Sequence, residues 1–117
     1  MNFAIAEFDP KSTYQPPVAC FEIKTCQRTL FIHEPTPELK IMFSLAKRSF
    51  EGADAYDYLL RFACGLESEI KGETDVFGQV KTAFKNLAVT HPELAESLRP
   101  IFLKIFEDTK EIRAQYL

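Results

Sequence analysis

The sequence of 117 residues contains no tryptophan, only two histidines and four glycines, and no long apolar run. None of its stretches approaches the roughly 18 apolar residues that a membrane-spanning helix needs. Its first eleven residues, MNFAIAEFDPK, also lack the basic start and the long apolar segment of a signal peptide. We therefore expect a cytoplasmic chain that does not enter a membrane.

Cysteine is scarce as well, with only Cys20, Cys26 and Cys64 in the chain. An odd number of cysteines does not favour a disulfide framework, and reduced thiols fit the cytosol. No two of them have the C-x-x-C spacing of a zinc site, and His33 is poorly placed to complete one. The sequence therefore gives no reason to expect a structural metal.

The formal net charge is −3 and there is no strongly basic tract. Composition alone therefore gives no reason to expect nucleic-acid binding, although a local patch would be compatible with it. Hydrophobic residues make up 46% and charged residues 26% of the chain, with eleven phenylalanines. These proportions are typical of one globular domain with a real core, which we expect to span residues 1–117.

The first half of the chain favours strands that are separated by proline-containing breaks. Strands are predicted over residues 2–8, 18–25 and 28–33, with breaks at 9–17 and 34–37. In the second strand, alternation predicts that Ala19, Phe21 and Ile23 face the core, whereas Cys20, Glu22 and Lys24 face away. Residues 39–50 permit a strand, a helix, or one followed by the other.

From residue 53 the apolar period becomes helical. Helices are predicted over 53–66, 75–89 and 92–117, and Gly65 is a candidate stop or bend for the first of them. Pro100 should kink or split the last helix. Strands followed by helices predict the α+β fold class, with a small antiparallel sheet packed with helices and a C-terminal helix over 91–117.

Two segments of the chain resemble one known family. The first is Lys24-Thr25-Cys26-Gln27-Arg28-Thr29, which is similar to the S-T-C-N-R-T-E motif of glutamyl-tRNA reductase. The second begins at Leu60-Arg61-Phe62-Ala63-Cys64-Gly65-Leu66-Glu67-Ser68 and continues through Gly72-Glu73 to Gly78-Gln79-Val80-Lys81-Thr82-Ala83. It resembles the family's F-R-V-A-x-G-L-D-S and G-E-x-Q-I-x-G-Q-V-K-x-A, with the same intervals. The second match is the more specific of the two.

The resemblance implies the N-terminal, glutamate-recognising domain of this enzyme, with a ferredoxin-like sheet whose first helix is reduced or absent. It also implies a reaction of tetrapyrrole biosynthesis. In the family, a cysteine thiolate attacks the ester between glutamate and tRNA, and NADPH reduces the resulting thioester to glutamate-1-semialdehyde. A thiolate nucleophile divides one difficult step into two easier ones, and a nearby cation favours its formation.

The resemblance assigns the nucleophile to Cys26. It implies that Arg28 binds the substrate carboxylate, for which a planar guanidinium is well suited. Thr25, Ser68 and Gln79 are candidates for polar contacts with the glutamyl group, although Ser68 and Gln79 also suit helix caps or turns. If the segment around Cys26 is extended, Lys24 and Arg28 lie on the same side as its thiol.

Two substitutions depart from the family pattern. Tyr58 stands where the family has a histidine that assists proton transfer, and a phenol is a far weaker base at neutral pH. Leu30 stands where the family has a glutamate able to bind the substrate's amino group. There is also no G-x-G-x-x-G turn for NADPH. The reductase hypothesis therefore requires a separate NADPH-binding chain or a longer protein.

Two further hypotheses are compatible with these departures. The chain could be a stand-alone, reductase-deficient paralogue that binds glutamate, glutamyl-tRNA or a protein of the tetrapyrrole pathway. It could instead be a structural paralogue that forms a homodimer through its last helix.

Overall fold

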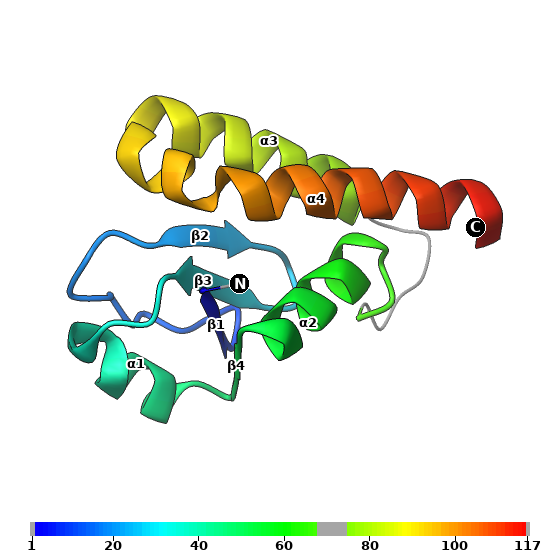
Figure 1. Ribbon diagram of the computed structural model, residues 1–117. Coiled ribbons are helices and arrows are strands. Elements are labelled where there is room, and N and C mark those ends of the chain that lie inside the picture. The colour runs from blue at the N-terminus through cyan, green and yellow to red at the C-terminus, as the bar shows by residue number, and fades with distance from the viewer. Residues whose placement is uncertain (1, 68–74, 117) are drawn as a thin grey trace. The chain divides into compact units, whose positions relative to one another are not determined.

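A computed structural model describes residues 2–67 and 75–116 of the chain (Figure 1). The fold divides into two compact units, residues 1–55 and residues 56–117. Within the described part, no helix is both long and apolar enough to cross a membrane.

The first unit is built around a four-stranded antiparallel sheet. Its strands are β1 (Ala4–Phe8), β2 (Phe21–Lys24), β3 (Thr29–His33) and β4 (Arg48–Glu51), in the order β2-β3-β1-β4. A 3-10 turn η1 (Pro37–Leu39) and the short helix α1 (Lys40–Leu45) connect β3 to β4. This order of elements is ferredoxin-like, with a loop in place of the first helix. The α+β prediction and the reduced N-terminal helix are thus confirmed.

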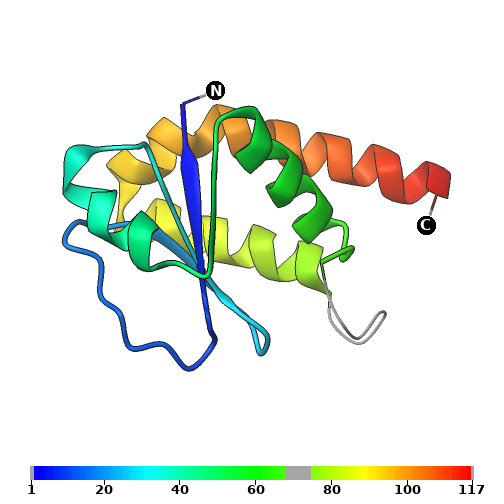
Figure 2. The same cartoon turned by 90° about the horizontal axis from the view of Figure 1, so that it is seen from below.

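One face of the sheet packs against α1 and the loop between β1 and β2 (Figure 2). Its apolar cluster consists of Ala6, Phe8, Phe31, Leu39 and Met42. Tyr14, from the loop, stacks on Phe8 with ring centroids 5.1 Å apart, so the loop supplies apolar cover where a helix is missing.

The second strand begins later than the sequence indicates. It starts at Phe21 and not at residue 18, so Ala19 and Cys20 belong to the preceding loop. Ala19 is exposed and Cys20 is half-buried against the cluster, which is the reverse of the predicted alternation. The alternation does hold inside the strand, where Phe21 and Ile23 are buried and Glu22 and Lys24 are exposed. Unpaired residues have no reason to keep a two-residue period.

The second unit is helical. It contains most of α2 (Ala53–Ala63), which begins in the last residues of the first unit, together with α3 (Val76–Thr90) and α4 (Pro92–Tyr116). Only His91 separates α3 from α4, and the two helices lie side by side in both views. Phe84 of α3 stacks on Phe102 of α4 with centroids 5.0 Å apart, at the centre of an aromatic cluster.

Pro100 does not split the last helix, which runs unbroken from Pro92 to Tyr116. The fully buried Leu98, Phe102 and Ile105 flank the proline. The free energy gained by burying these apolar side chains offsets the cost of the backbone hydrogen bond that proline cannot donate.

The predicted stop of α2 at Gly65 is confirmed, and this residue has a φ of +82°. Its backbone N–H donates to the carbonyl of Phe62, and that of Leu66 donates to the carbonyl of Arg61. This pair of bonds is the Schellman arrangement that ends a helix with a left-handed residue, and it favours glycine at that position. Leu66, which the helical period places in the core, lies beyond this end and is exposed.

Candidate functional site

The Thr25 to Arg28 segment forms the tight connection between β2 and β3. Lys24 and Thr29 are the last pair of the ladder, and the backbone N–H of Thr25 donates to the carbonyl of Arg28 at 2.9 Å. The Thr25 hydroxyl accepts hydrogen bonds from the backbone N–H groups of Gln27 and Arg28, each at 3.2 Å. It also donates to the Arg28 carbonyl at 3.3 Å. Thr25 therefore holds the turn in shape, which is a structural role that the sequence did not reveal.

Cys26 lies in this turn and is exposed, whereas Cys20 and Cys64 are half-buried. Burial raises the pKa of Cys20 to about 11, and it also raises the pKa of Cys64. Cys26 is thus the cysteine that a large substrate can reach most directly.

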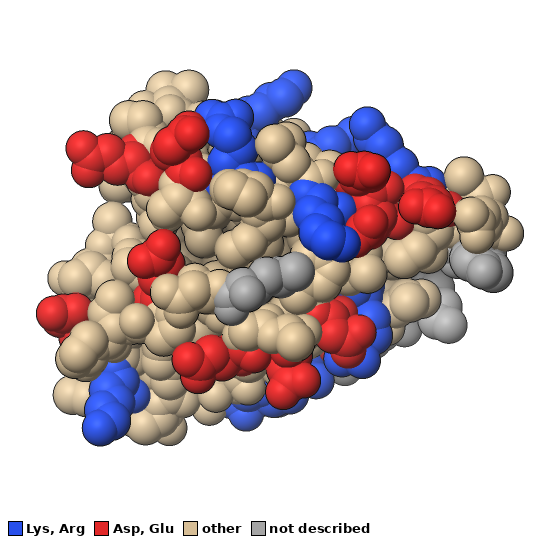
Figure 3. Space-filling model, viewed as in Figure 1, with Lys and Arg blue, Asp and Glu red and all other residues tan. Residues whose placement is uncertain are grey.

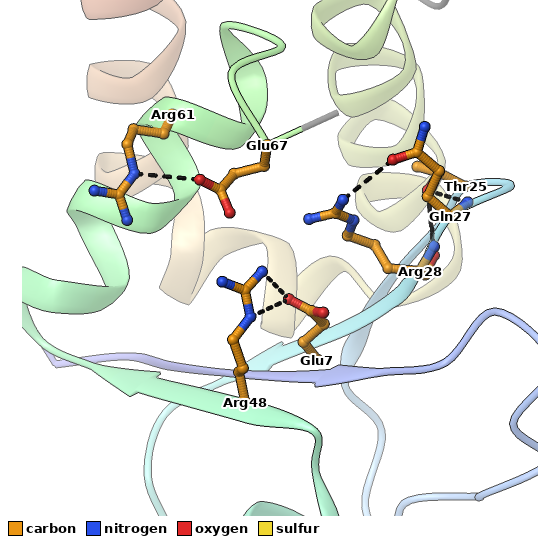
Figure 4. Close-up of polar contacts among 7 residues, drawn as sticks. All are labelled: Glu7, Thr25, Gln27, Arg28, Arg48, Arg61 and Glu67. Atoms are coloured by element: carbon orange, nitrogen blue, oxygen red, sulfur yellow. Dashed lines mark hydrogen bonds and ion pairs between the residues drawn. The ribbon is translucent and has the colours of Figure 1, made fainter. Parts of the chain in front are cut away.

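Arg28 follows the turn and is buried, with 8% of its surface exposed. Its Nη2 donates to Oε1 of Gln27 at 3.2 Å (Figure 4). Lys24, in contrast, is exposed. The segment around Cys26 is not extended, so the alternation that would place Lys24 and Arg28 on the same side as its thiol does not apply here.

A charged pair that the sequence did not single out lies on the same sheet. Glu7 is buried in the middle of the sheet, with 4% of its surface exposed, and Arg48 of β4 is its register partner. Nε and Nη2 of Arg48 both donate to Oε1 of Glu7, at 3.0 and 2.6 Å (Figure 4). On its other side Glu7 pairs with Leu30. A carboxylate therefore lies on the strand next to the position where Leu30 replaces the glutamate of the family motif. In the sequence, Glu7 is marked only as a charged residue inside an otherwise apolar strand.

The other two predicted contact residues belong to the second half of the chain. Gln79 is exposed in the first turn of α3, where its backbone N–H donates to the carbonyl of Asp75. Ser68 lies outside the described residues, as does Glu73. The structure therefore places Thr25, Cys26 and Arg28 together in one turn of the first unit and Gln79 in the second unit.

The helix that carries Gln79 has a well-formed start. The side chain of Asp75 accepts a hydrogen bond from the backbone N–H of Gly78 at 2.9 Å. A Cβ atom on residue 78 would lie 2.3 Å from Oδ2 of Asp75, so glycine leaves room for this cap. The Gly78-Gln79 part of the motif thus has a local structural reason.

Tyr58 is fully buried in α2 and stacks on Phe62, with centroids 6.3 Å apart. Arg61, on the next turn, forms ion pairs with Asp57 at 2.9 Å and Glu67 at 3.5 Å. Arg61 of the second motif is thus paired with two acidic residues of its own unit, and Figure 4 shows its pair with Glu67.

The first unit also has a hollow of about 570 Å³. It lies beside β4 on the face of the sheet that carries α1, and its lining includes Thr36, Lys40, Phe43 and Ser49. Thr25, Cys26 and Arg28 do not line it, so it is separate from the turn. Among the described residues, no cluster of histidine, cysteine, aspartate and glutamate is placed to hold a metal ion.

Charges of both signs are interspersed along α4 on the face shown in Figure 3. Arg99 pairs with Glu96 at 3.1 Å, and Lys104 pairs with Asp108 at 3.0 Å. Lys81 and Lys85 of α3 are exposed, as expected for solvent-facing residues. Neighbouring acidic groups thus offset part of the positive charge along the last helix.

Comparison with known proteins gives a consistent answer. The family model described as glutamyl-tRNAGlu reductase, N-terminal domain, matches residues 7–116. The chain is similar to a glutamyl-tRNA reductase of Pseudoalteromonas translucida (strain TAC 125), with 40% identity over 65 residues, which are 56% of this chain and 15% of the relative. It is also similar to one of Francisella tularensis subsp. novicida (strain U112), with 29% identity over 85 residues, 73% of this chain and 19% of the relative. The matched part is thus a small share of each relative's length. No solved structure matches the chain.

Proposed function

This chain belongs to the family of the glutamyl-tRNA reductase N-terminal domain, and on that premise we propose that it performs the acyl-transfer half of the reductase reaction. The observation that carries the proposal is the exposed Cys26 in the turn formed by the family motif, with Arg28 two residues later. Cysteine is the strongest nucleophile among ordinary side chains once it is a thiolate.

In the proposed step, the Cys26 thiolate attacks the carbonyl carbon of the glutamyl ester on tRNA. A bond forms between Sγ and the carbonyl carbon, and the bond from that carbon to the ribose oxygen of tRNA breaks. The ribose oxygen leaves with the electron pair and takes up a proton, so the products are a glutamyl thioester on Cys26 and free tRNA. Arg28 binds the side-chain carboxylate of the glutamyl group.

The proposal for this chain ends at the thioester. Its four glycines do not form a G-x-G-x-x-G turn, so its residues do not fit NADPH in the usual dinucleotide-binding manner. We assign the reduction to a part outside residues 1–117, in the same polypeptide or in a separate chain. The cytoplasm is the compartment in which we place the reaction.

A single-turnover incubation with tRNA carrying labelled glutamate tests the proposal. We expect label on the protein in an acid-stable, hydroxylamine-sensitive adduct, together with free tRNA. Cys26→Ser should lose the adduct, whereas Cys20→Ser and Cys64→Ser should keep it, because those thiols are half-buried. Neither adduct nor tRNA deacylation in the folded wild-type protein would rule out acyl transfer.

A second candidate function has one observation in its favour. Tyr58, at the position of the family's histidine, is fully buried against Phe62 and has an apolar environment on that side. A buried tyrosine in place of that histidine is a far weaker base at neutral pH, which suits a binding module for glutamate or glutamyl-tRNA. This function predicts that glutamyl-tRNA binds and that its ester bond stays intact.

A further inference from the structure

Strand β4 forms one edge of the sheet. In the order β2-β3-β1-β4 it pairs only with β1 among the residues that the structure describes, and its residues Arg48, Ser49 and Glu51 are exposed. An edge strand presents backbone N–H and C=O groups that no neighbouring strand uses. Such an edge can accept an extended segment of another chain as a further strand.

The hydrogen bonds to β1 show which backbone groups of β4 face outward. Directly after the strand, the backbone N–H of Gly52 donates to the carbonyl of Phe3 at 2.9 Å. The bonds of an antiparallel ladder involve every second residue, so Gly52 and Phe50 direct their backbone groups toward β1. Ser49 and Glu51 direct theirs the other way. These two residues therefore offer N–H donors and carbonyl acceptors at the outer edge of the sheet.

The hollow of about 570 Å³ lies beside this edge. Ser49 is the register partner of Ala6, a member of the cluster under α1, so the side chains of Ser49 and Glu51 lie on the face that carries α1. Both residues line the hollow, and Phe43 and Pro37 supply apolar parts of its wall. Its volume is in the range of pockets that hold small molecules, so it has room for a large apolar side chain.

Two charged groups at the hollow indicate which side chains suit it. Lys40 and Glu51 both line it and are exposed, and neither forms an ion pair within residues 2–67 and 75–116. In an added strand, the residue opposite Glu51 lies next to this carboxylate, and a basic side chain there is favourable. The ammonium group of Lys40 disfavours a second cation inside the hollow, which leaves that place to an apolar side chain.

A peptide segment suits this edge better than a second copy of the chain. Two copies that paired through β4 would present Ser49 and Glu51 to each other's hollow, and neither side chain is apolar. The strand has four residues, and pairing over such a short length provides little of the roughly 1,200 Å² that a stable interface buries. A peptide needs no such area to bind transiently.

We propose that β4 and the adjoining hollow form a docking site for an extended peptide segment of a partner protein, which joins the sheet as an antiparallel strand. The peptide residue opposite Ser49 places an apolar side chain in the hollow. The residue opposite Glu51, two positions earlier in the peptide, is basic. This site is separate from the proposed acyl transfer, because the residues of the Cys26 turn do not line the hollow.

Calorimetry with a synthetic peptide and the whole chain tests the proposal. The blocked peptide T-T-K-T-F-T-T carries lysine and phenylalanine at the required spacing, and we expect a Kd below about 1 mM. An N-methyl group on the phenylalanine nitrogen removes the N–H that donates to the Ser49 carbonyl, so binding should weaken about tenfold or more. The matched control carries the N-methyl group on the preceding threonine, whose N–H points away from β4, and should change binding less than about twofold.

Variants of the protein test the same contacts from the other side. Ser49→Pro removes an N–H that faces away from β1, which an edge strand tolerates, and should weaken binding of the unmethylated peptide about tenfold or more. Ser49→Ala keeps the N–H and should bind it as the wild-type chain does. Glu51→Gln should abolish the preference for this peptide over the same peptide with glutamate in place of lysine. If Ser49→Pro does not fold, the methylated peptides carry the test with wild-type protein.

Three results would overturn the docking site. The first is no binding of the unmethylated peptide at millimolar concentration, and the second is an equal loss from both N-methyl groups. The third is a dimer in sedimentation that Ser49→Pro dissociates, which would show that a second copy of the chain occupies the edge.

Discussion

Accessibility distinguishes the three thiols at the scale of single residues. Cys26 is exposed in its turn, whereas Cys20 and Cys64 are half-buried and burial raises the pKa of both. Because only the thiolate reacts with alkylating agents, these differences have a measurable consequence.

We predict that iodoacetamide at pH 8 modifies Cys26 before Cys20. With a pKa of about 11, roughly one in a thousand Cys20 side chains is a thiolate at pH 8. Raising the pH should speed the alkylation of Cys20 about tenfold per unit until the pH approaches 11, provided that the fold persists. Mass spectrometry of the alkylated peptides measures each rate. Modification of Cys20 as fast as that of Cys26 at pH 8 would contradict this assignment of burial.

The second residue-scale prediction concerns Thr25. Its hydroxyl accepts two backbone hydrogen bonds and donates a third within the turn. Thr25→Val keeps the shape of the side chain and removes the hydroxyl, so we expect a loss of about 1–3 kcal/mol in the free energy of unfolding. Thr25→Ser, which keeps the hydroxyl, is the control and should lose much less. Equal stability of the valine and serine variants by urea denaturation would show that the hydroxyl does not hold the turn.

The sequence correctly predicted that Thr25, Cys26 and Arg28 lie in or beside one connection between strands, because the motif is continuous. It did not predict that the Thr25 hydroxyl bonds to the turn itself, or that Arg28 is buried while Lys24 is exposed. The sequence did not predict that Glu7 lies beside Leu30, because this position depends on the register between β1 and β3, which no local sequence pattern contains.

At the scale of elements, the end of α2 depends on the backbone of one residue. Gly65 has a φ of +82°, and a Cβ atom added there would meet nothing within 4 Å. The cost of a substitution therefore comes from the backbone alone and not from a clash.

We predict that Gly65→Ala lowers the free energy of unfolding by about 1 kcal/mol. Asparagine tolerates the left-handed region better, so Gly65→Asn should cost less. Urea denaturation of the three proteins side by side measures both differences. Alanine as stable as glycine at this position would contradict the Schellman end of the helix.

Helical periodicity predicted α2, α3 and α4 with ends close to those observed, because each helix buries a long apolar stripe. The sequence did not decide between a helix and a strand for residues 39–50. In the structure this segment contains α1, followed by β4. Both elements are too short to show a period of their own. Their identity is set by tertiary contacts, such as those of Met42 in the cluster under α1.

At the scale of the whole molecule, the chain corresponds to a limited part of much longer relatives. The matched residues cover 15% of the Pseudoalteromonas relative and 19% of the Francisella relative. The sheet unit carries Cys26, the proposed nucleophile, and Arg28, which we propose binds the substrate's carboxylate. Glu7 also belongs to this unit, whereas Gln79 lies in the helical unit. Acyl transfer is thus the part of the reductase reaction that we propose for this chain.

Peptide mass spectrometry of the protein after incubation with glutamyl-tRNA, without any reductant, tests the central claim most directly. Quenched in acid and digested under acidic conditions, the wild-type protein should yield the peptide that contains Cys26 with the added mass of one glutamyl group. Hydroxylamine should remove that mass, and the peptides of Cys20 and Cys64 should remain unmodified. A glutamyl group on another residue would contradict the account. An unmodified Cys26 peptide would also contradict it, if the protein is folded and has consumed the glutamyl-tRNA.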